Sequence, residues 1–233
     1  MFNVFDAGVI LFLNDFARQS VWLDAFAHGF TNNYLLKSAS LIALIYWAWF
    51  QRYPDAIQQR AAKARLLIAL LAAFAAPACA RIFELLLPFR PRPLHEPLLH
   101  FIEPLFMRED VDRDWSSFPS DTMALIVPLV IGLFLVSRRI GWLALVIAVL
   151  AALARMYSGL HYPTDIMGGA ALGVIAFVVL DRPWLKQKLT APCFWLLEKY
   201  PQIFYVGFFL FTYQIANVFE QAFNIIKNVF RHG

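Results

Sequence analysis

Long apolar segments separated by short charged loops are the feature that most restricts how this chain can fold. Six of them recur, and they cover residues 34–50, 66–87, 122–136, 140–154, 165–180 and 203–218. A helix needs about 20 residues to cross the hydrocarbon core of a bilayer. Because 61% of the 233 residues are hydrophobic and only 15% are charged, one soluble core cannot bury them all. We therefore predict an all-α, polytopic transmembrane helical bundle with five to six spans.

The whole chain, residues 1–233, is predicted to form a single membrane domain with three parts. Residues 1–32 mix apolar and polar side chains as amphipathic segments at a membrane interface do. Residues 33–181 form the core, and residues 182–233 add the last span and a weakly amphipathic tail. Acidic residues occur early in the chain, starting at Asp6, so we expect the first span rather than a cleavable signal peptide to direct insertion.

The positive charges between the spans predict the orientation of the bundle. Short loops rich in Lys and Arg stay in the cytoplasm, and residues 51–65 contain several of them against Asp55 alone. Counting spans from this loop places the basic connection 182–199 on the same side. The loop 88–119 and the turn 156–164 then lie on the extracytoplasmic side. These two segments also contain the residues that are unusual for a membrane protein.

Composition argues against a nucleic-acid-binding protein and against a fold built on cysteine-bound metal or disulfides. The net charge is +4, but the basic residues form no aromatic-interleaved face of the kind that binds nucleic acid. The two cysteines, Cys79 and Cys193, lie far apart in apolar or boundary surroundings. They follow neither a metal-binding nor a disulfide pattern, and we interpret them as packing residues.

The turn between the fourth and fifth spans combines three groups that suit phosphate chemistry. Arg155, His161 and Asp165 follow the pattern R-x5-H-x3-D. A guanidinium binds two phosphate oxygens in a fork, a neutral imidazole attacks phosphorus, and a carboxylate orients the imidazole. Each residue taken alone has an ordinary explanation, such as contact with headgroups or a favourable place in a first helical turn. Together, at this spacing, they predict a nucleophilic phosphate site.

Two further clusters precede that turn. Ser120, Asp121 and Thr122 stand at the start of a span, where free backbone N–H groups bind anions, although an ordinary N-cap explains the same residues. Arg90 and Arg92, each followed by Pro, are held with little conformational freedom. Anchoring to anionic headgroups is the alternative for this pair.

In this order, the three clusters resemble the signature of the type 2 phosphatidic acid phosphatase (PAP2) superfamily of membrane lipid phosphatases. The match covers roughly residues 80–170, and the sequence of residues 115–122 is similar to that of the undecaprenyl pyrophosphate phosphatase branch. The resemblance implies a helical membrane core without metal or other cofactor. It also implies action on a membrane lipid phosphate at the extracytoplasmic side of a bacterial-type inner (cytoplasmic) membrane.

Transferred by position, the resemblance implies that His161 is the nucleophile, that Asp165 is its orienting partner, and that a phosphohistidine intermediate forms. The substrate-binding residues that it implies are Arg90, Arg92, Ser120, Asp121, Thr122 and Arg155. The preferred substrate on this basis is a polyprenyl pyrophosphate.

Two positions depart from the family pattern. A Lys normally stands seven residues before the Arg-Pro pair, but Phe83 precedes Arg90 and Leu85 precedes Arg92 at that spacing. Arg81 is the nearest cation. The second motif normally ends in a His that protonates the leaving group, and Thr122 stands there.

Three hypotheses account for Thr122, because positioned acid catalysis is worth about 10² to 10⁴ in rate. In the first, a lipid pyrophosphate expels a lipid monophosphate, which needs no proton. In the second, Asp121, His95 or His100 supplies the proton. In the third, hydrolysis is lost and a lipid-phosphate-binding protein remains.

Two other activities remain open from the sequence. Another lipid or a sugar, instead of water, can take the phosphate from His161, which would make the protein a phosphotransferase. A small transporter or channel for an anionic solute is also possible, although no span carries a central series of charges.

Overall fold

The computed structural model describes residues 3–106 and 115–217, and these residues contain helices but no strand. The helices are α1 (Val4–Asn14), α2 (Val21–Asn32), α3 (Ser38–Phe50), α4 (Ala56–Leu86), α5 (Asp121–Val136), α6 (Arg138–Tyr157), α7 (Pro163–Leu180), α8 (Pro183–Lys199) and α9 (Pro201–Ala216). Three short 3-10 helices accompany them: η1 (Tyr34–Leu36), η2 (Pro93–His95) and η3 (Pro97–Leu99). The predicted all-α class is confirmed.

Three of the described helices, α4, α6 and α7, are long and apolar enough to cross a membrane. The helices α3 and α5 are apolar but shorter, with 13 and 16 residues. All five coincide with predicted spans, and the chain is a polytopic membrane protein. The predicted sixth span corresponds to α9, whose described part ends at Ala216. The predicted tail lies mostly outside the described residues.

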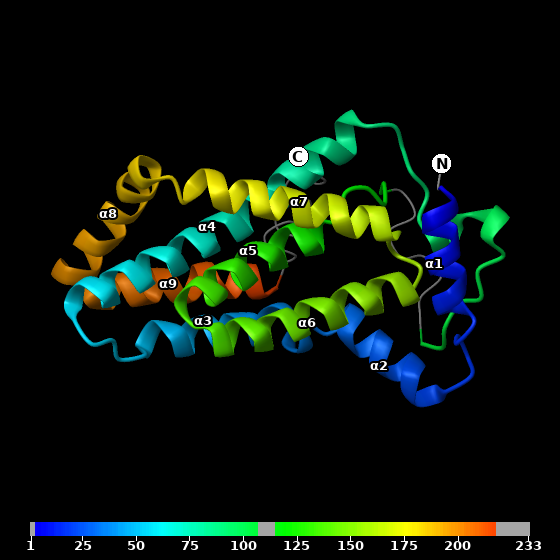
Figure 1. Cartoon of the computed structure of the whole chain (residues 1–233), viewed down its shortest axis with the longest axis horizontal. Helices are drawn as coiled ribbons and strands as arrows, with labels where there is room; N and C mark the ends of the chain where they lie inside the picture. Colours follow the sequence, from blue (N-terminus) through cyan, green and yellow to red (C-terminus); the bar gives the residue numbers. More distant parts are fainter. Residues whose placement is uncertain (1–2, 107–114, 218–233) are drawn as a thin grey trace, which may run out of the picture.

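Helix α5 forms the centre of the bundle, because it packs against α4, α6 and α7 (Figure 1). Its side chains are buried along most of its length. Small residues allow the close approach: Gly132 lies against Ala69 of α4, where an added Cβ would collide. The helices α4 and α5 therefore pack closely at this position.

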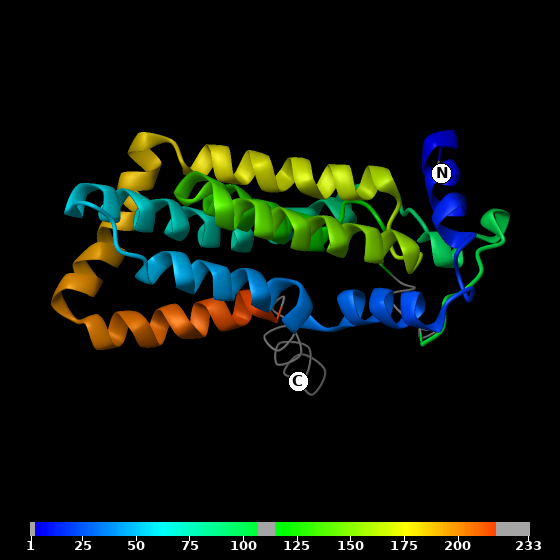
Figure 2. The ribbon, with the colours of Figure 1, turned by 60° about the horizontal axis from the view of Figure 1, so that its bottom comes forward.

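The two ends of the bundle differ. At one end, α8 connects α7 to α9, and the short α3–α4 and α5–α6 connections lie there too (Figures 1 and 2). The basic residues that predicted a cytoplasmic side are all at this end. More of these basic residues lie in helices than we predicted, because residues 51–65 and 182–199 were expected to be connections. Helix α4 begins at Ala56, capped by Asp55, and α8 occupies the predicted connection 182–199. Good helix formers such as Ala, Gln, Lys and Arg fill the first turns of α4 and extend it beyond the apolar span.

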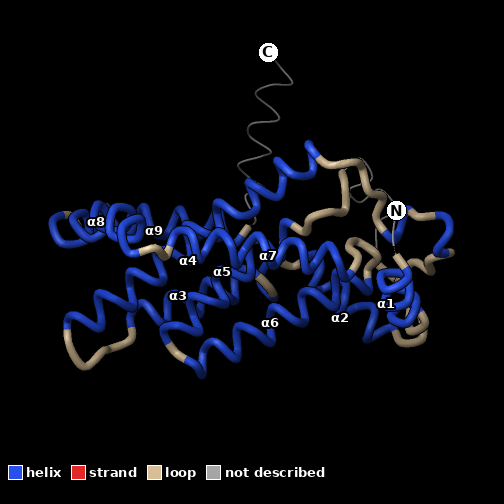
Figure 3. Tube along the Cα trace, turned by 45° about the horizontal axis from the view of Figure 1, so that its top comes forward, coloured by secondary structure: helices blue, strands red, loops and turns tan. Residues whose placement is uncertain are grey.

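The opposite end holds the described residues of the segment after α4, which Figure 3 draws as loop apart from η2 and η3. Helix α1 lies crosswise over this end (Figure 1), whereas α2 runs roughly in line with α3 (Figure 2). The predicted interfacial segment 1–32 thus consists of two helices with different directions. Asp6, Ile10 and Asn14 form the buried face of α1, and Phe5 and Phe12 are exposed on it.

Candidate active site

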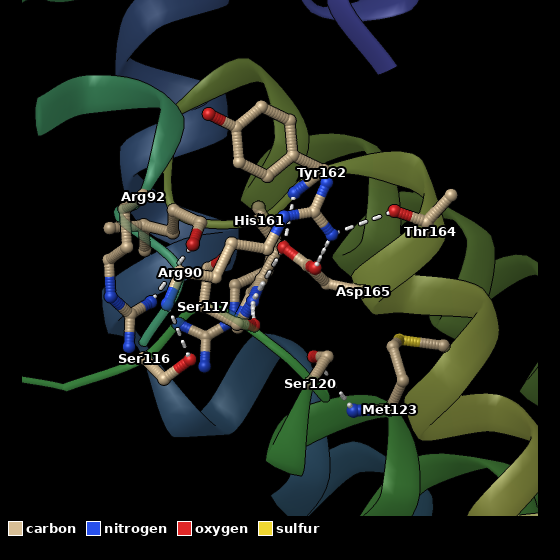
Figure 4. Close-up of polar contacts among 12 residues, drawn as sticks. Arg90, Arg92, Ser116, Ser117, Ser120, Met123, His161, Tyr162, Thr164 and Asp165 are labelled. Carbon is tan, nitrogen blue, oxygen red and sulfur yellow. Dashed lines mark hydrogen bonds and ion pairs between the residues drawn. The ribbon is translucent and has the colours of Figure 1, made fainter. Parts of the chain in front are cut away.

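His161 lies in the short connection between α6 and α7 and is 1% exposed. Its Nδ1 is 2.9 Å from the backbone carbonyl oxygen of Ser117 (Figure 4). Since a carbonyl only accepts, Nδ1 carries the proton and Nε2 keeps its lone pair. Nε2 is buried and has no hydrogen-bond partner among residues 3–106 and 115–217. The ring is therefore fixed in the tautomer that a nucleophile requires.

The charge state of the ring agrees with that role. Burial lowers the pKa of His161 well below 6.5, and the nearby positive charges of Arg92 and Arg155 lower it further, whereas Asp121 acts in the opposite direction. The imidazole is consequently neutral near pH 7.

Asp165 stands in the first turn of α7 and is fully buried. Its Oδ2 accepts the backbone N–H of Tyr162 at 2.7 Å, and its Oδ1 is 2.5 Å from Nη1 of Arg90. The same Oδ2 lies 3.9 Å from Nδ1 of His161, which is longer than a hydrogen bond. Its predicted role as the orienting partner stays a prediction, and the backbone carbonyl of Ser117 makes the direct contact.

The two arginines that each precede a proline, Arg90 and Arg92, occupy different environments. Arg90 pairs with two buried carboxylates, Asp165 and Asp6, and its guanidinium lies 4.2 Å from the centre of the Tyr162 ring (Figure 4). Arg92 is 4% exposed and donates from Nη1 to the carbonyl of Leu160 at 3.0 Å. Arg92 acts electrostatically on the neighbouring His161, and the predicted contact of either arginine with phosphate stays a prediction.

Asp6 is a site residue that sequence reasoning missed. The only signal was its position on the same helical face as Ile10 and Asn14, where a carboxylate is unexpected in an otherwise packed surface.

Ser120 joins α5 to α7 at the edge of the site. Its hydroxyl caps α5 by accepting the N–H of Met123 at 3.4 Å, and its own N–H donates to the carbonyl of Asp165 at 3.1 Å. Gly169 of α7 lies against the Ser120 carbonyl so closely that a Cβ there would collide. Ser120 therefore fixes the second cluster against the third, and its predicted contact with phosphate stays a prediction.

Thr122 is 2% exposed, and its hydroxyl accepts a hydrogen bond from Nη2 of Arg155. The neighbouring Asp121 pairs with Arg81 at 2.6 Å and is 3.7 Å from Arg155. Arg81 also pairs with Glu84, three residues further along α4, at 2.8 Å. The place of the missing histidine is therefore occupied by a hydroxyl that a guanidinium contacts.

Arg81 lies two residues before Phe83 and four before Leu85, the two positions at which the family Lys is expected, and it reaches Asp121 across the α4–α5 contact. His100 is exposed and has a left-handed φ of 47°. Within the described ranges, no three His, Cys, Asp or Glu side chains gather in a way that would hold a metal ion. Independence from metal stays a prediction.

Comparison with known proteins decides the family. The model of the PAP2 superfamily matches residues 65–187, which is more than half of the chain and includes all three clusters. The chain belongs to the PAP2 superfamily. No solved structure matches it.

Curated relatives of this PAP2 protein include three bacterial proteins. The bacitracin transport permease protein BcrC of Bacillus licheniformis is 27% identical over 81% of this chain and 84% of its own length. The undecaprenyl-diphosphatase BcrC of Bacillus subtilis is 30% identical over 37% of this chain and 42% of its own length. The putative undecaprenyl-diphosphatase YbjG of Escherichia coli is 28% identical over 64% and 68%. Family and relatives together support a membrane lipid phosphatase of the PAP2 type.

Proposed function

We propose that this protein hydrolyses the terminal phosphate of a membrane lipid pyrophosphate, preferably a polyprenyl pyrophosphate, through a phosphohistidine intermediate and without metal. Two relatives are named as undecaprenyl-diphosphatases, one of them putatively. The fixed tautomer and neutral state of His161 support nucleophilic attack by Nε2.

The first chemical step balances without a proton. The Nε2 lone pair forms a bond to the terminal phosphorus while the bridging P–O bond breaks, and the lipid monophosphate leaves with the electron pair. The ring then carries one positive charge, and its Nδ1–H remains hydrogen-bonded to the Ser117 carbonyl. In the second step, water attacks phosphorus and both of its hydrogens stay on the released phosphate, while the N–P electron pair returns to His161.

The contact of Arg155 with Thr122 is the observation that favours a pyrophosphate. A guanidinium stabilises an oxygen that departs as a phosphate anion, but it does not protonate an alkoxide at neutral pH. The nearest hydrogen-bond acceptor of Arg155 is a neutral hydroxyl, and the carboxylate of Asp121 is farther away, at 3.7 Å. Under this proposal, the positive charge of Arg155 stabilises the negative charge that develops on the leaving group.

Phosphate release from purified protein in detergent tests this proposal. The substrates are a polyprenyl pyrophosphate, the matching polyprenyl monophosphate and a phosphatidate, each with wild type and His161→Ala. We expect the pyrophosphate to be cleaved at least about 10² times faster than either monophosphate, the gap that missing acid catalysis leaves. His161→Ala should release no phosphate, and a chelator should not change the wild-type rate.

Equal turnover of pyrophosphate and monophosphate would contradict the assignment of the leaving group. In that case Asp121→Ala, His95→Ala and His100→Ala test the alternative proton donors. Binding of lipid phosphate without any release would favour a protein that has lost hydrolysis, and transfer to an added lipid or sugar alcohol would favour a phosphotransferase.

The second candidate function is transport, because one relative is named a transport permease protein. Flux of an anionic solute through proteoliposomes tests it. We also propose that the end of the bundle with His161 faces the extracytoplasmic side of a cytoplasmic membrane, since the basic residues gather at the other end. Labelling of single cysteines at the two ends in intact cells tests this orientation.

A further inference from the structure

Helix α1 contributes a buried charge to the site from the far end of the sequence. Asp6 is 0% exposed although it belongs to a short helix whose outer face is exposed and apolar. Burial of a carboxylate is costly unless other groups compensate for the lost water. The groups that do so here all belong to the site.

Three groups fix the Asp6 carboxylate. Oδ2 is 2.6 Å from Nη2 of Arg90 and 2.8 Å from the hydroxyl of Thr164, and Oδ1 accepts the backbone N–H of Thr164 at 3.1 Å. Nη1 of Arg90 donates to the same Thr164 hydroxyl at 2.8 Å and contacts Asp165 (Figure 4). Asp6 and Asp165 therefore hold Arg90 between them.

The rest of α1 is attached independently of Asp6. Ile10 packs against Leu99 and Tyr162. Asn14 exchanges two hydrogen bonds with the backbone of Ile102, at 2.7 Å and 2.8 Å. These contacts position the helix, so the carboxylate of Asp6 is not needed merely to keep α1 in place.

The charge balance indicates what Asp6 does. Arg90 alone would neutralise Asp165, whereas Arg90 shared between two carboxylates leaves the group with one net negative charge. That charge lies near the His161 ring, because Asp165 Oδ2 is 3.9 Å from Nδ1. A ring that becomes positive during attack is stabilised by it, and burial strengthens the interaction.

We propose that Asp6 is a positioning residue for the phosphatase reaction, acting through Arg90 to hold the carboxylate of Asp165 in its orientation beside His161. This inference rests on the proposed function. It also assigns Arg90 to the carboxylates and leaves phosphate binding to Arg92 and Arg155.

The test compares Asp6→Asn with two control variants in detergent, using polyprenyl pyrophosphate. Asp15→Asn removes an exposed carboxylate at the end of the same helix. Asp24→Asn removes a buried carboxylate of α2 that contacts Tyr157 and the backbone of Leu105, away from His161. We expect Asp6→Asn to lower kcat about 10- to 100-fold, as loss of an outer partner commonly does, with KM changed less than about threefold. Both controls should keep the wild-type kcat, even where Asp24→Asn lowers Tm.

A double-mutant cycle identifies the path of the effect. If Asp6 acts through Arg90, then adding Asp6→Asn to Arg90→Gln causes no further loss of kcat. Losses that multiply would overturn the inference, and so would a wild-type kcat in Asp6→Asn. Should Asp6→Asn fail to fold, Thr164→Val interrupts the same network and carries the same expectation of lower kcat with unchanged KM.

Failure of the proposed function is distinguishable from failure of this inference. Activity that survives His161→Ala removes the proposed function and leaves the role of Asp6 without a reaction. Activity that needs His161 but not Asp6 removes only the inference.

Discussion

The two halves of the candidate site differ in what their side chains contact. In the proposed mechanism the attack half consists of Arg90, Ser117, His161 and Asp165, and hydrogen bonds to backbone and carboxylate groups orient the side chains of Arg90, His161 and Asp165. The departure half consists of Arg81, Asp121, Thr122 and Arg155, and it is an ion-pair network with one hydroxyl in the place of an imidazole.

The difference shows that the two chemical tasks of a phosphatase have separate structural requirements. Attack on phosphorus needs a neutral ring in one tautomer, which the carbonyl of Ser117 and burial provide for His161. Departure needs either a proton or a positive charge, according to the leaving group. Under the proposed function, a chain that keeps the first half and has Thr122 beside Arg155 in place of the proton donor acts on leaving groups that are stable as anions.

Restoring the proton donor should produce the largest effect. Thr122→His supplies an acid in the departure half, and we expect release from a lipid monophosphate to rise by about 10² to 10⁴. Release from the pyrophosphate should change little, since its leaving group needs no proton. Steady-state phosphate release measures both rates.

The matched control is Thr122→Val, which removes the hydroxyl that Arg155 contacts and adds no acid. It should give no gain on the monophosphate. If Thr122→His accelerates both substrates equally, the two halves are not independent and the comparison is wrong.

Replacing Arg155, the guanidinium of the departure half, by a side chain without two parallel donors should have the next largest effect. Arg155→Lys keeps the charge but loses the planar pair of donors. We expect kcat/KM for the pyrophosphate to fall about 10²-fold, the cost of one donor that stabilises transition-state charge. Arg139→Lys, exposed at the other end of α6, is the control. Unchanged kinetics of Arg155→Lys would remove this residue from the site.

Much of the fold and the core of the site could be predicted from the sequence, because both depend on local patterns. Apolar length predicts the spans, and the spacing of Arg155, His161 and Asp165 predicts a common location at one helix–helix turn. Tertiary contacts determine the rest. Arg90 and Arg92 each precede a proline, and only their partners distinguish them.

Two features of the attack half had no usable sequence signal. The acceptor for Nδ1 of His161 is a backbone carbonyl, which any residue provides. Asp6 reaches Arg90 across 84 positions in the chain, through a helix that the sequence characterises only as amphipathic. Contacts of this kind follow from packing and not from residue type.

The contact between Gly169 of α7 and the carbonyl of Ser120 should not tolerate a larger side chain. Gly169→Ala places a Cβ against the carbonyl of Ser120, and we expect the free energy of unfolding to fall by about 1–3 kcal/mol, as in other overpacked contacts. Thermal unfolding in detergent measures the shift in Tm. Gly207→Ala on α9 is the control, because nothing lies within 4 Å of its added Cβ. Equal Tm values for the two variants would mean that α5 and α7 adjust freely at the site.

The smallest expected effect concerns the charge state on which the attack half depends. Burial, Arg92 and Arg155 lower the pKa of His161 well below 6.5 in the folded protein, whereas the unfolded chain binds a proton near 6.5. Below that pH the unfolded state therefore holds more protons, and stability falls as the pH falls. Between pH 6.5 and 5.5, wild type should lose up to about 1 kcal/mol relative to His161→Gln, with no relative change above pH 7.5.

Thermal unfolding of both proteins across this pH range measures the difference, and the glutamine variant cancels the contribution of every other titrating group. A gap in Tm that stays constant down to pH 5.5 would mean that His161 takes up a proton as readily in the folded protein as in the unfolded chain. In mild acid, His161 would then be protonated and could not attack phosphorus. The contrast between a fixed attack half and a departure half without a proton donor would no longer account for the chemistry of the site.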